Sequence, residues 1–259
     1  MALVENLIGA GVPAQLADLL VPDITTTETA FPLFYQGSQV YSKAFTGLTG
    51  PNNSSATQAH GISNMSKVVF LHACGEAASN FWYTGPNGKT SSTGADSYLA
   101  LDGTNINLAS ASDLSGSTYN GVILYTKSSG GDDDLREKAM GLGASAGLAK
   151  ALIPDISTTE QETPYTRNGK QVYMKGFTGI TGPNNATVST AHGLPSGFEL
   201  AWIIGSMDDG TNFLPLPNGD NNSGNGATNI ECTSTNFTIN SGENYSTYTA
   251  QATLFYTID

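Results

Sequence analysis

Charged residues are scarce in this chain, and basic residues are scarcer still. Only 12% of the 259 residues are charged, and 22 acidic against 10 basic residues give a formal net charge of −12. Nucleic-acid affinity comes largely from Lys and Arg, which neutralise phosphates and release counterions. The composition therefore argues against nucleic acid as a partner.

Cysteine and long apolar runs are also rare. Cys74 and Cys232 lie at non-equivalent places of the internal repeat described below, so they indicate neither a shared disulfide framework nor a metal site, and we expect buried free thiols. No apolar run approaches the roughly 18 residues of a membrane span, and the N-terminus lacks the basic start and cleavage site of a signal peptide. We expect a soluble protein made in the cytoplasm, without membrane insertion.

What the chain does contain is a long internal repeat. Residues 39–53 return as residues 171–185, and pairing 22–61 with 154–193 gives 23 identities in 40 positions without a gap. Because periods of roughly 20 to 50 residues mark solenoids, an offset of 132 residues indicates a whole folded unit in tandem. The middle sections, 76–96 and 208–227, differ and are rich in Gly, Asn and Ser, as surface loops on a common scaffold are.

Each copy begins with helical spacing. Apolar residues of segment 3–8 lie on one helical face, and Pro13 opens a second short helix before Pro22 stops it. The second copy repeats this plan, with Ser145 as the N-cap and Pro154 as the stop. Helices this short are marginal alone. We expect their apolar stripes to associate around a threefold axis or against a docking surface.

After each helical segment the apolar period changes to two, which predicts strands. The predicted strands of the first copy are 39–46, 57–62, 67–74, 80–84, 98–101, 104–108 and 120–127. Those of the second copy are 189–194, 199–205, 212–216, 229–233, 236–240 and 250–258.

Seven or so short strands per copy predict a mainly β protein with two tandem β-sandwich, jelly-roll-like domains, each preceded by a short α-helical segment. The predicted parts are a helical segment over 1–21, a first sandwich over 22–128, a linker and second helical segment over 129–153, and a second sandwich over 154–259.

His60 and His192 are the most tempting candidate site residues, because each precedes glycine at the end of a predicted strand. Catalysis would need a partner nucleophile or carboxylate, which this motif does not bring. We therefore expect each imidazole to bond to backbone. His72 aligns with Ile204, so a metal pair among the three histidines is not expected.

Three polar segments have simple interpretations. Segment 218–224 resembles a calcium loop but lacks glycine at its sixth position and has Asn229 where a glutamate is needed, so it predicts a solvated loop. The acidic run 132–134 predicts a solvated linker or a negative start for the following helix. Segment 208–211 predicts a turn.

Trp82 and Trp202 could be glycan-stacking platforms, but they align with Leu214 and Phe70, and we predict that both belong to the core. There is no phosphate loop, no Gly-x-Ser-x-Gly elbow and no carboxylate pair common to the copies. The sequence predicts no catalytic, cofactor-binding or metal-binding residue.

An ordered set of motifs recurs in both copies. It comprises Gly-x-Gln-Val-Tyr-x-Lys-x-Phe, a Gly-rich Pro-Asn-Asn turn, Ala-His-Gly, and a closing Leu-Tyr-Thr-Lys or Phe-Tyr-Thr-Ile strand. Over 36–127 and again over 168–258, it resembles a domain family found in virion proteins of tailed bacteriophages. The resemblance implies a β-sandwich carried by fibres, spikes or decoration proteins, commonly as homotrimers, without catalytic residues. The second copy departs from the pattern by ending in Ile258 where the first has Lys127.

These observations lead to one expectation and two alternatives. We expect a non-enzymatic homotrimer on the virion surface, a head fibre or capsid decoration protein with capsid or tail proteins as partners and no cofactor. The first alternative is a tail fibre, adaptor or receptor-binding adhesin whose loops 85–96 and 217–226 hold host surface glycan. A polysaccharide depolymerase is the enzyme alternative, and the lack of paired carboxylates argues against it.

Overall fold

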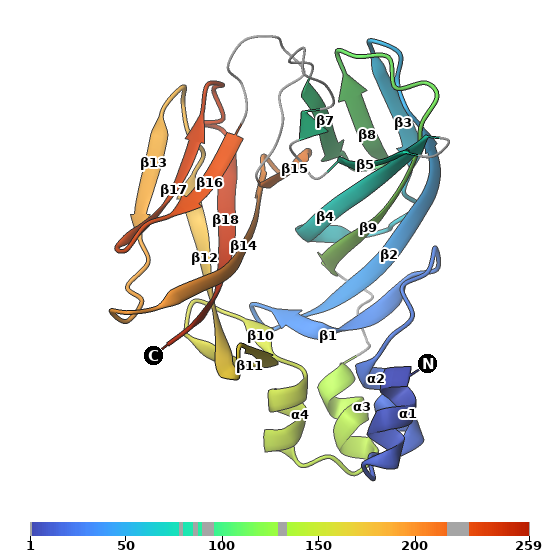
Figure 1. The fold of residues 1–259 in the computed structure, drawn as a ribbon, viewed down its shortest axis with the longest axis vertical. Helices are drawn as coiled ribbons and strands as arrows, with labels where there is room; N and C mark the ends of the chain where they lie inside the picture. Colours follow the sequence, from blue (N-terminus) through green and yellow to red (C-terminus); the bar gives the residue numbers. More distant parts are fainter. Residues whose placement is uncertain are drawn as a thin grey trace.

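The fold is built from several antiparallel β-sheets above a small cluster of helices (Figure 1). This computed structural model describes residues 2–77, 80–84, 88–89, 96–128, 134–216 and 228–258. The predicted fold class, mainly β and of sandwich type, is confirmed. Within these ranges no helix is long and apolar enough to cross a membrane.

The described residues contain four short helices in two pairs, α1 (Ala2–Gly9) with α2 (Ala14–Leu20), and α3 (Leu135–Gly141) with α4 (Ala146–Leu152). The N-cap at Ser145 is confirmed, since its Oγ accepts from Leu148 N at 3.2 Å. The Asp134 carboxylate caps α3 by accepting from Arg136 N at 2.8 Å, so this aspartate is the negative helix start that the sequence allowed.

The two helix pairs pack on each other and on the first sheet. Their shared core contains Leu16 of α2, Leu135 and Ala139 of α3, Ala149 of α4 and Phe34. Each helix pair therefore covers part of the other's apolar stripe within one chain, while Ile8, Met140 and Leu148 remain exposed. Association of the helices around a threefold axis or against a docking surface stays a prediction.

The described strands of the first half form two sheet portions, one of five strands and one of three. The first portion belongs to a six-stranded sheet, and the second belongs to a nine-stranded sheet that continues into the second half. The first portion contains β1 (Thr29–Tyr35), β2 (Ser38–Thr49), β9 (Thr118–Lys127), β4 (Met65–Ala77) and β5 (Asn80–Thr84), in that order. The second portion contains β7 (Asp96–Leu101), β8 (Asn105–Ser110) and β3 (Ser55–Ala59), with β6 (Gly88–Lys89) beside β7.

The second half repeats this strand order. Its larger sheet contains β11 (Gln161–Arg167), β12 (Lys170–Thr181), β18 (Thr249–Thr257), β14 (Glu199–Asp208) and β15 (Phe213–Leu216). The smaller one contains β16 (Thr228–Cys232), β17 (Asn236–Ser241) and β13 (Thr187–Ala191).

The two halves exchange contacts at several points. β15 pairs with β7 through Phe213 and Leu101, and the short strand β10 (Asp155–Ile156) adds to β1 in parallel. Phe213 packs in the core of the first half, while Ala100 packs in the core of the second. Because sheets and cores cross the middle of the chain, the division into two separate domains stays a prediction.

Strands β1 and β11 were not predicted from the sequence. Each contains a proline, Pro32 or Pro164, and each shows a register shift there, between Phe31 and Phe34 and between Glu162 and Thr166. Proline cannot donate to a sheet ladder and is confined to edges and bulges. The bulge therefore accommodates the proline, and the proline interrupts the alternation from which a strand is predicted.

Candidate binding groove between the two halves

The two candidate histidines hold backbone in the same way. His60 Nδ1 accepts from Ile62 N at 3.0 Å, and its Nε2 donates to Asp102 O at 3.1 Å. His192 accepts from Leu194 N at 3.0 Å and donates to Thr233 O at 3.1 Å. Both rings are buried, and this bonding assigns each the neutral tautomer with its proton on Nε2. Neither ring has a nitrogen left for a metal or substrate, which agrees with the predicted structural role.

Burial also lowers the pKa of His60, and the nearby Lys43 ammonium acts in the same direction. The Asp102 carbonyl bond opposes this lowering. Lys43 is itself tied down, because its Nζ donates to Gly61 O at 2.9 Å. The imidazole is therefore held neutral as a structural group.

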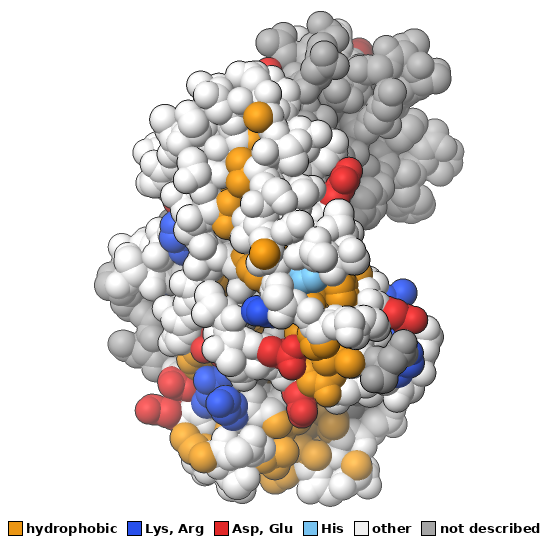
Figure 2. Space-filling model, turned by 90° about the vertical axis from the view of Figure 1, so that its left-hand side faces the viewer, with side chains coloured by type: hydrophobic (Ala, Val, Ile, Leu, Met, Phe, Trp, Pro, Cys, Tyr) orange, Lys and Arg blue, Asp and Glu red, His pale blue; other side chains and the backbone are white. Residues whose placement is uncertain are grey.

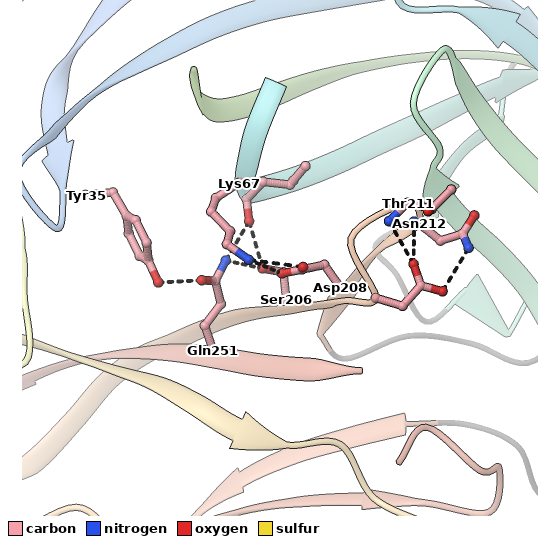
Figure 3. A network of polar contacts seen from close by, with 9 residues as sticks. Tyr35, Lys67, Ser206, Asp208, Thr211, Asn212 and Gln251 are labelled. Atoms are coloured by element: carbon pink, nitrogen blue, oxygen red, sulfur yellow. Dashed lines mark hydrogen bonds and ion pairs between the residues drawn. The ribbon is translucent and has the colours of Figure 1, made fainter. Parts of the chain in front are cut away.

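Carboxylates in the described ranges serve turns and ion pairs. Asp209 Oδ1 accepts from Thr211 N at 2.9 Å and Asn212 N at 2.7 Å, within the predicted turn (Figure 3). Partial burial tends to raise the pKa of Asp209, but these hydrogen bonds lower it to about 2. Among the residues that the structure describes, no group of three or more His, Cys, Asp or Glu could hold a metal ion.

The prediction of buried thiols was wrong for Cys74. Cys74 and Cys232 are free thiols, but Cys74 is exposed and Cys232 only half-buried. Cys74 alternates with the buried Ala73 and Gly75, so the pleat of β4 turns its side chain outward. Partial burial raises the pKa of the Cys232 thiol.

A polar seam joins the two halves (Figure 3). Tyr35 Oη donates to Gln251 Oε1 at 2.5 Å, and Gln251 Nε2 donates to Val68 O at 3.0 Å. Ser206 Oγ also donates to Val68 O, at 2.7 Å. Burial raises the pKa of the Tyr35 phenol, which keeps it a donor. At the end of the seam Lys67 Nζ lies 2.8 Å from the Asp208 carboxylate.

Next to this seam an apolar groove opens between the halves, with a volume of about 380 Å³. Its walls come from β1, β4 and β9 on one side and from β10, β11, β12, β14 and β18 on the other. Four pairs of repeat-equivalent positions line it: Phe31 and Thr163, Leu33 and Tyr165, Phe70 and Trp202, and Leu124 and Phe255.

Trp202 lies in this groove, and its prediction as a core residue was wrong. Its side chain is 40% exposed and stacks on Phe255 with the ring centroids 4.6 Å apart. Its repeat equivalent Phe70 lines the same groove and is itself only partly buried, and both strands have a register shift just before this position. Tyr165 adds a second exposed ring at 56%.

Further apolar side chains are exposed on the helices. Figure 2 shows hydrophobic side chains gathered in the lower part of one face, while much of the upper part is covered by uncharged polar groups and backbone. Exposed apolar residues of the helices are Ile8, Met140 and Leu148. On this face the lower part also contains most of the visible charged groups, so the apolar side chains there lie among charged ones.

Several predicted features lie outside the described residues. These are the loop interpretation of 218–224, most of the loops 85–96 and 217–226, and the acidic residues 132–133. The side chain of Trp82 also lies outside them, although its backbone is paired with Gly75 in β5.

No family model and no curated protein matches this chain. Among solved structures, it is similar to the collagen-binding domain of the surface protein RspB of Erysipelothrix rhusiopathiae. The identity is 12%, the match covers 88% of this chain and 78% of that chain, and the TM-score is 0.23. A likeness this low supports no argument about fold or function.

Proposed function

We propose that this chain is a non-enzymatic structural protein of the outer surface of a tailed-phage particle, a homotrimeric head fibre or capsid decoration protein. The observation that carries the proposal is that the polar residues of the recurring motif hold backbone in both halves. The glutamines and histidines form equivalent bonds in the two halves, the lysines bond to neighbouring carbonyls at the same strand end, and these bonds serve the fold.

The motif glutamine is the first case. Gln39 Nε2 donates to three carbonyls, those of Phe31 at 2.6 Å, Leu33 at 3.1 Å and Val40 at 2.8 Å. Gln171 Nε2 donates to the equivalent carbonyls at 2.5, 3.3 and 2.9 Å, which are those of Thr163, Tyr165 and Val172.

The motif lysine is the second case. Lys43 Nζ donates to Gly61 O, and Lys175 Nζ donates to His192 O at 3.0 Å, beside the imidazole that closes the same strand end. A motif whose amide, ammonium and imidazole groups bond to backbone is typical of a scaffold. It supports a protein whose surfaces, and not reactive groups, perform its function.

Gold-labelled antibody against the purified protein tests the proposal on intact phage particles. We expect the labels on the head surface. The number of labels per particle should be proportional to the copy number of the protein, which mass spectrometry measures. Labels on the tail would favour the tail-fibre alternative, and particles that lack the protein would contradict the proposal.

A receptor-binding adhesin is the second candidate, and the exposed aromatic rings in the groove favour it. Trp202 stacked on Phe255, with Tyr165 nearby, offers the apolar ring faces that sugar C–H groups pack on. A glycan array probed with the native protein and with Trp202→Ala tests it. Binding that the variant loses supports an adhesin, and no binding by the native protein at high concentration excludes host glycan as its ligand.

A further inference from the structure

The second half is attached to the first by a short parallel strand. β10 lies beside β1 above the helices (Figure 1), where Phe34 N donates to Pro154 O at 2.8 Å and Gln36 N donates to Ile156 O at 2.9 Å. Ile156 is 0% exposed and packs in a core cluster with residues of both halves, among them Tyr35 and Met174.

The side chain of Asp155 completes this attachment. Its carboxylate accepts from Gly37 N, with distances of 3.2 and 3.1 Å to its two oxygens. Gly37 belongs to the hairpin turn between β1 and β2, in which Gln36 and Gly37 both have positive φ, 51° and 77°. The receiving site is thus the edge of β1 together with the turn that follows it.

The same tripeptide Pro-Asp-Ile stands at 22–24 in the first half, where it pairs with no described strand. Ile24 is 43% exposed, in contrast to its buried equivalent. The segment is nevertheless held in the same place on its own half. Ala44 N donates to Thr25 O at 2.7 Å, just as Gly176 N donates to Ser157 O at 2.7 Å.

The equivalent receiving edge is present on β11 and is open. β11 ends its sheet, and no described strand pairs with its outer side. Thr166 and Arg167 are exposed there, although α4 lies nearby, whereas the β1 residues equivalent to them are buried. The turn is also conserved between the halves, since Asn168 and Gly169 have φ of 53° and 77°.

We propose that residues 22–24 of one copy add as a short parallel strand to β11 of a second copy, in the way that β10 adds to β1 within the chain. Thr166 N and Asn168 N would donate to the carbonyls of Pro22 and Ile24, and the Asp23 carboxylate would face Gly169 N. When a strand adds to a free sheet edge, main-chain hydrogen bonds give the affinity and the pockets for its side chains give the specificity.

This contact is heterologous, because the donor segment and the receiving edge are different surfaces of one chain. Each copy can therefore donate to one neighbour and receive from another, and the contacts close into a ring when the rotation allows. The homotrimer proposed above would be a ring closed by three such contacts. The inference therefore adds to that proposal the contact by which its copies join.

Sedimentation velocity of the full chain over a range of concentrations tests the donor side. We expect the native protein to assemble and Ile24→Asp to need a concentration at least about ten-fold higher, since a charge replaces an apolar side chain that the proposed joint would bury. Ile8→Asp, which changes an equally exposed isoleucine on α1, should assemble like the native protein. A native protein that stays monomeric, or an I24D variant that assembles normally, overturns the proposal.

Thr166→Pro tests the receiving side, because proline removes the outward N–H, while Thr166→Ala keeps it. We expect T166P alone to stay monomeric and T166A to assemble. An equimolar mixture of T166P and I24D should give a two-chain species and nothing larger, since the pair retains one donor and one edge. A mixture that stays monomeric contradicts a head-to-tail joint.

A peptide of residues 21–28 gives a readout that does not depend on the folding of a variant. Added to the native protein it should disperse the assembly, and the same peptide with aspartate in place of Ile24 should not. Assembly that neither peptide affects overturns this joint but leaves the homotrimer proposal standing. A chain that is a homotrimer but absent from phage particles contradicts the proposed function and leaves the joint intact.

Discussion

At the scale of single residues, this protein uses its polar groups to fix backbone. The imidazoles of His60 and His192 each bridge a backbone N–H and a carbonyl, and the two ammonium groups of Lys43 and Lys175 each bond to a carbonyl beside them. Bonds of this kind stabilise the fold, because each one satisfies a backbone group that would otherwise lack a partner.

The first prediction concerns pH. Because the pKa of His60 is lowered in the folded protein, the unfolded chain takes up the proton first. Stability is then complete above the unfolded pKa of about 6.5 and falls as the pH drops below it, by up to about 1.4 kcal/mol per pH unit for one such group. Urea unfolding at pH values between about 7.5 and 5.5 measures this loss of stability. Ordinary carboxyl groups titrate below that range and therefore contribute little to it.

His60→Gln is the matched variant. It should lower the free energy of unfolding at neutral pH and reduce the pH dependence below about 6.5, because one titrating ring is removed. Part of the dependence should persist, since burial also lowers the pKa of His72. A variant whose slope equals that of the native protein would show that this ring does not control acid stability.

The second prediction concerns Gly50, which has its counterpart in Gly182. A Cβ on Gly50 would lie 2.1 Å from Leu114 O, and one on Gly182 would lie 2.1 Å from Tyr245 O. Because backbone atoms cannot move aside cheaply, we expect Gly50→Ala to cost about 2 kcal/mol or more. Gly103→Ala is the control, since an added Cβ meets nothing within 4 Å there. Equal stability of the two variants in urea would contradict this.

At the scale of elements, most strands could be predicted from alternation, and the exceptions have a common cause. β1 and β11 each contain a proline in a bulge, so neither shows a clean period of two. The short strand β10 forms only because the edge of β1 lies beside it, and two residues carry no periodic signal. The repeat itself could be found from sequence because equivalent bonds need equivalent side chains.

The groove could not be predicted in the same way. Its walls come from strands far apart in the chain, and Trp202 in an apolar strand looks like a core residue until the facing half is in place. The equivalence of Trp202 with Phe70 in the repeat was the available signal. Two equivalent aromatic positions are consistent with any surface that both copies share, a core or a groove.

The third prediction is that Gln39 fastens the bulge of β1 to β2. Its side chain supplies three bonds to carbonyls and accepts one from Leu135 N at 3.1 Å, so it also ties α3 to the sheet. Gln39→Ala should cost about 2 kcal/mol or more, because the carbonyls lose partners in a buried place. Thr49→Ala, at the exposed end of β2, should change the unfolding free energy by less than about 0.5 kcal/mol. Indistinguishable variants would refute the role of the amide.

At the scale of the whole molecule, the two halves depend on each other. Phe213 of the second half fills the core of the first, and Ala100 of the first lies in the core of the second. The helices α2, α3 and α4, which come from both halves, share one core. Elements that bury one another unfold together. The chain should therefore behave as one cooperative unit despite its internal repeat.

The fourth prediction follows from this exchange. Phe213→Ala should lower the free energy of unfolding by about 3 to 5 kcal/mol. It should loosen both halves, because the removed side chain belongs to the second half and leaves a cavity in the core of the first. Tyr165→Ala, which removes an exposed ring, is the control. Hydrogen exchange should show protection falling in β4 and β14 alike. Loss confined to one half would mean that the halves unfold independently.

The central claim is that the chain is a structural component of the phage exterior. Electron cryomicroscopy of native particles and of particles made without this gene product tests it most directly. We predict extra density outside the shell of the native particles that fits the paired sandwiches and is missing from the others. Identical reconstructions of both particles would contradict the account.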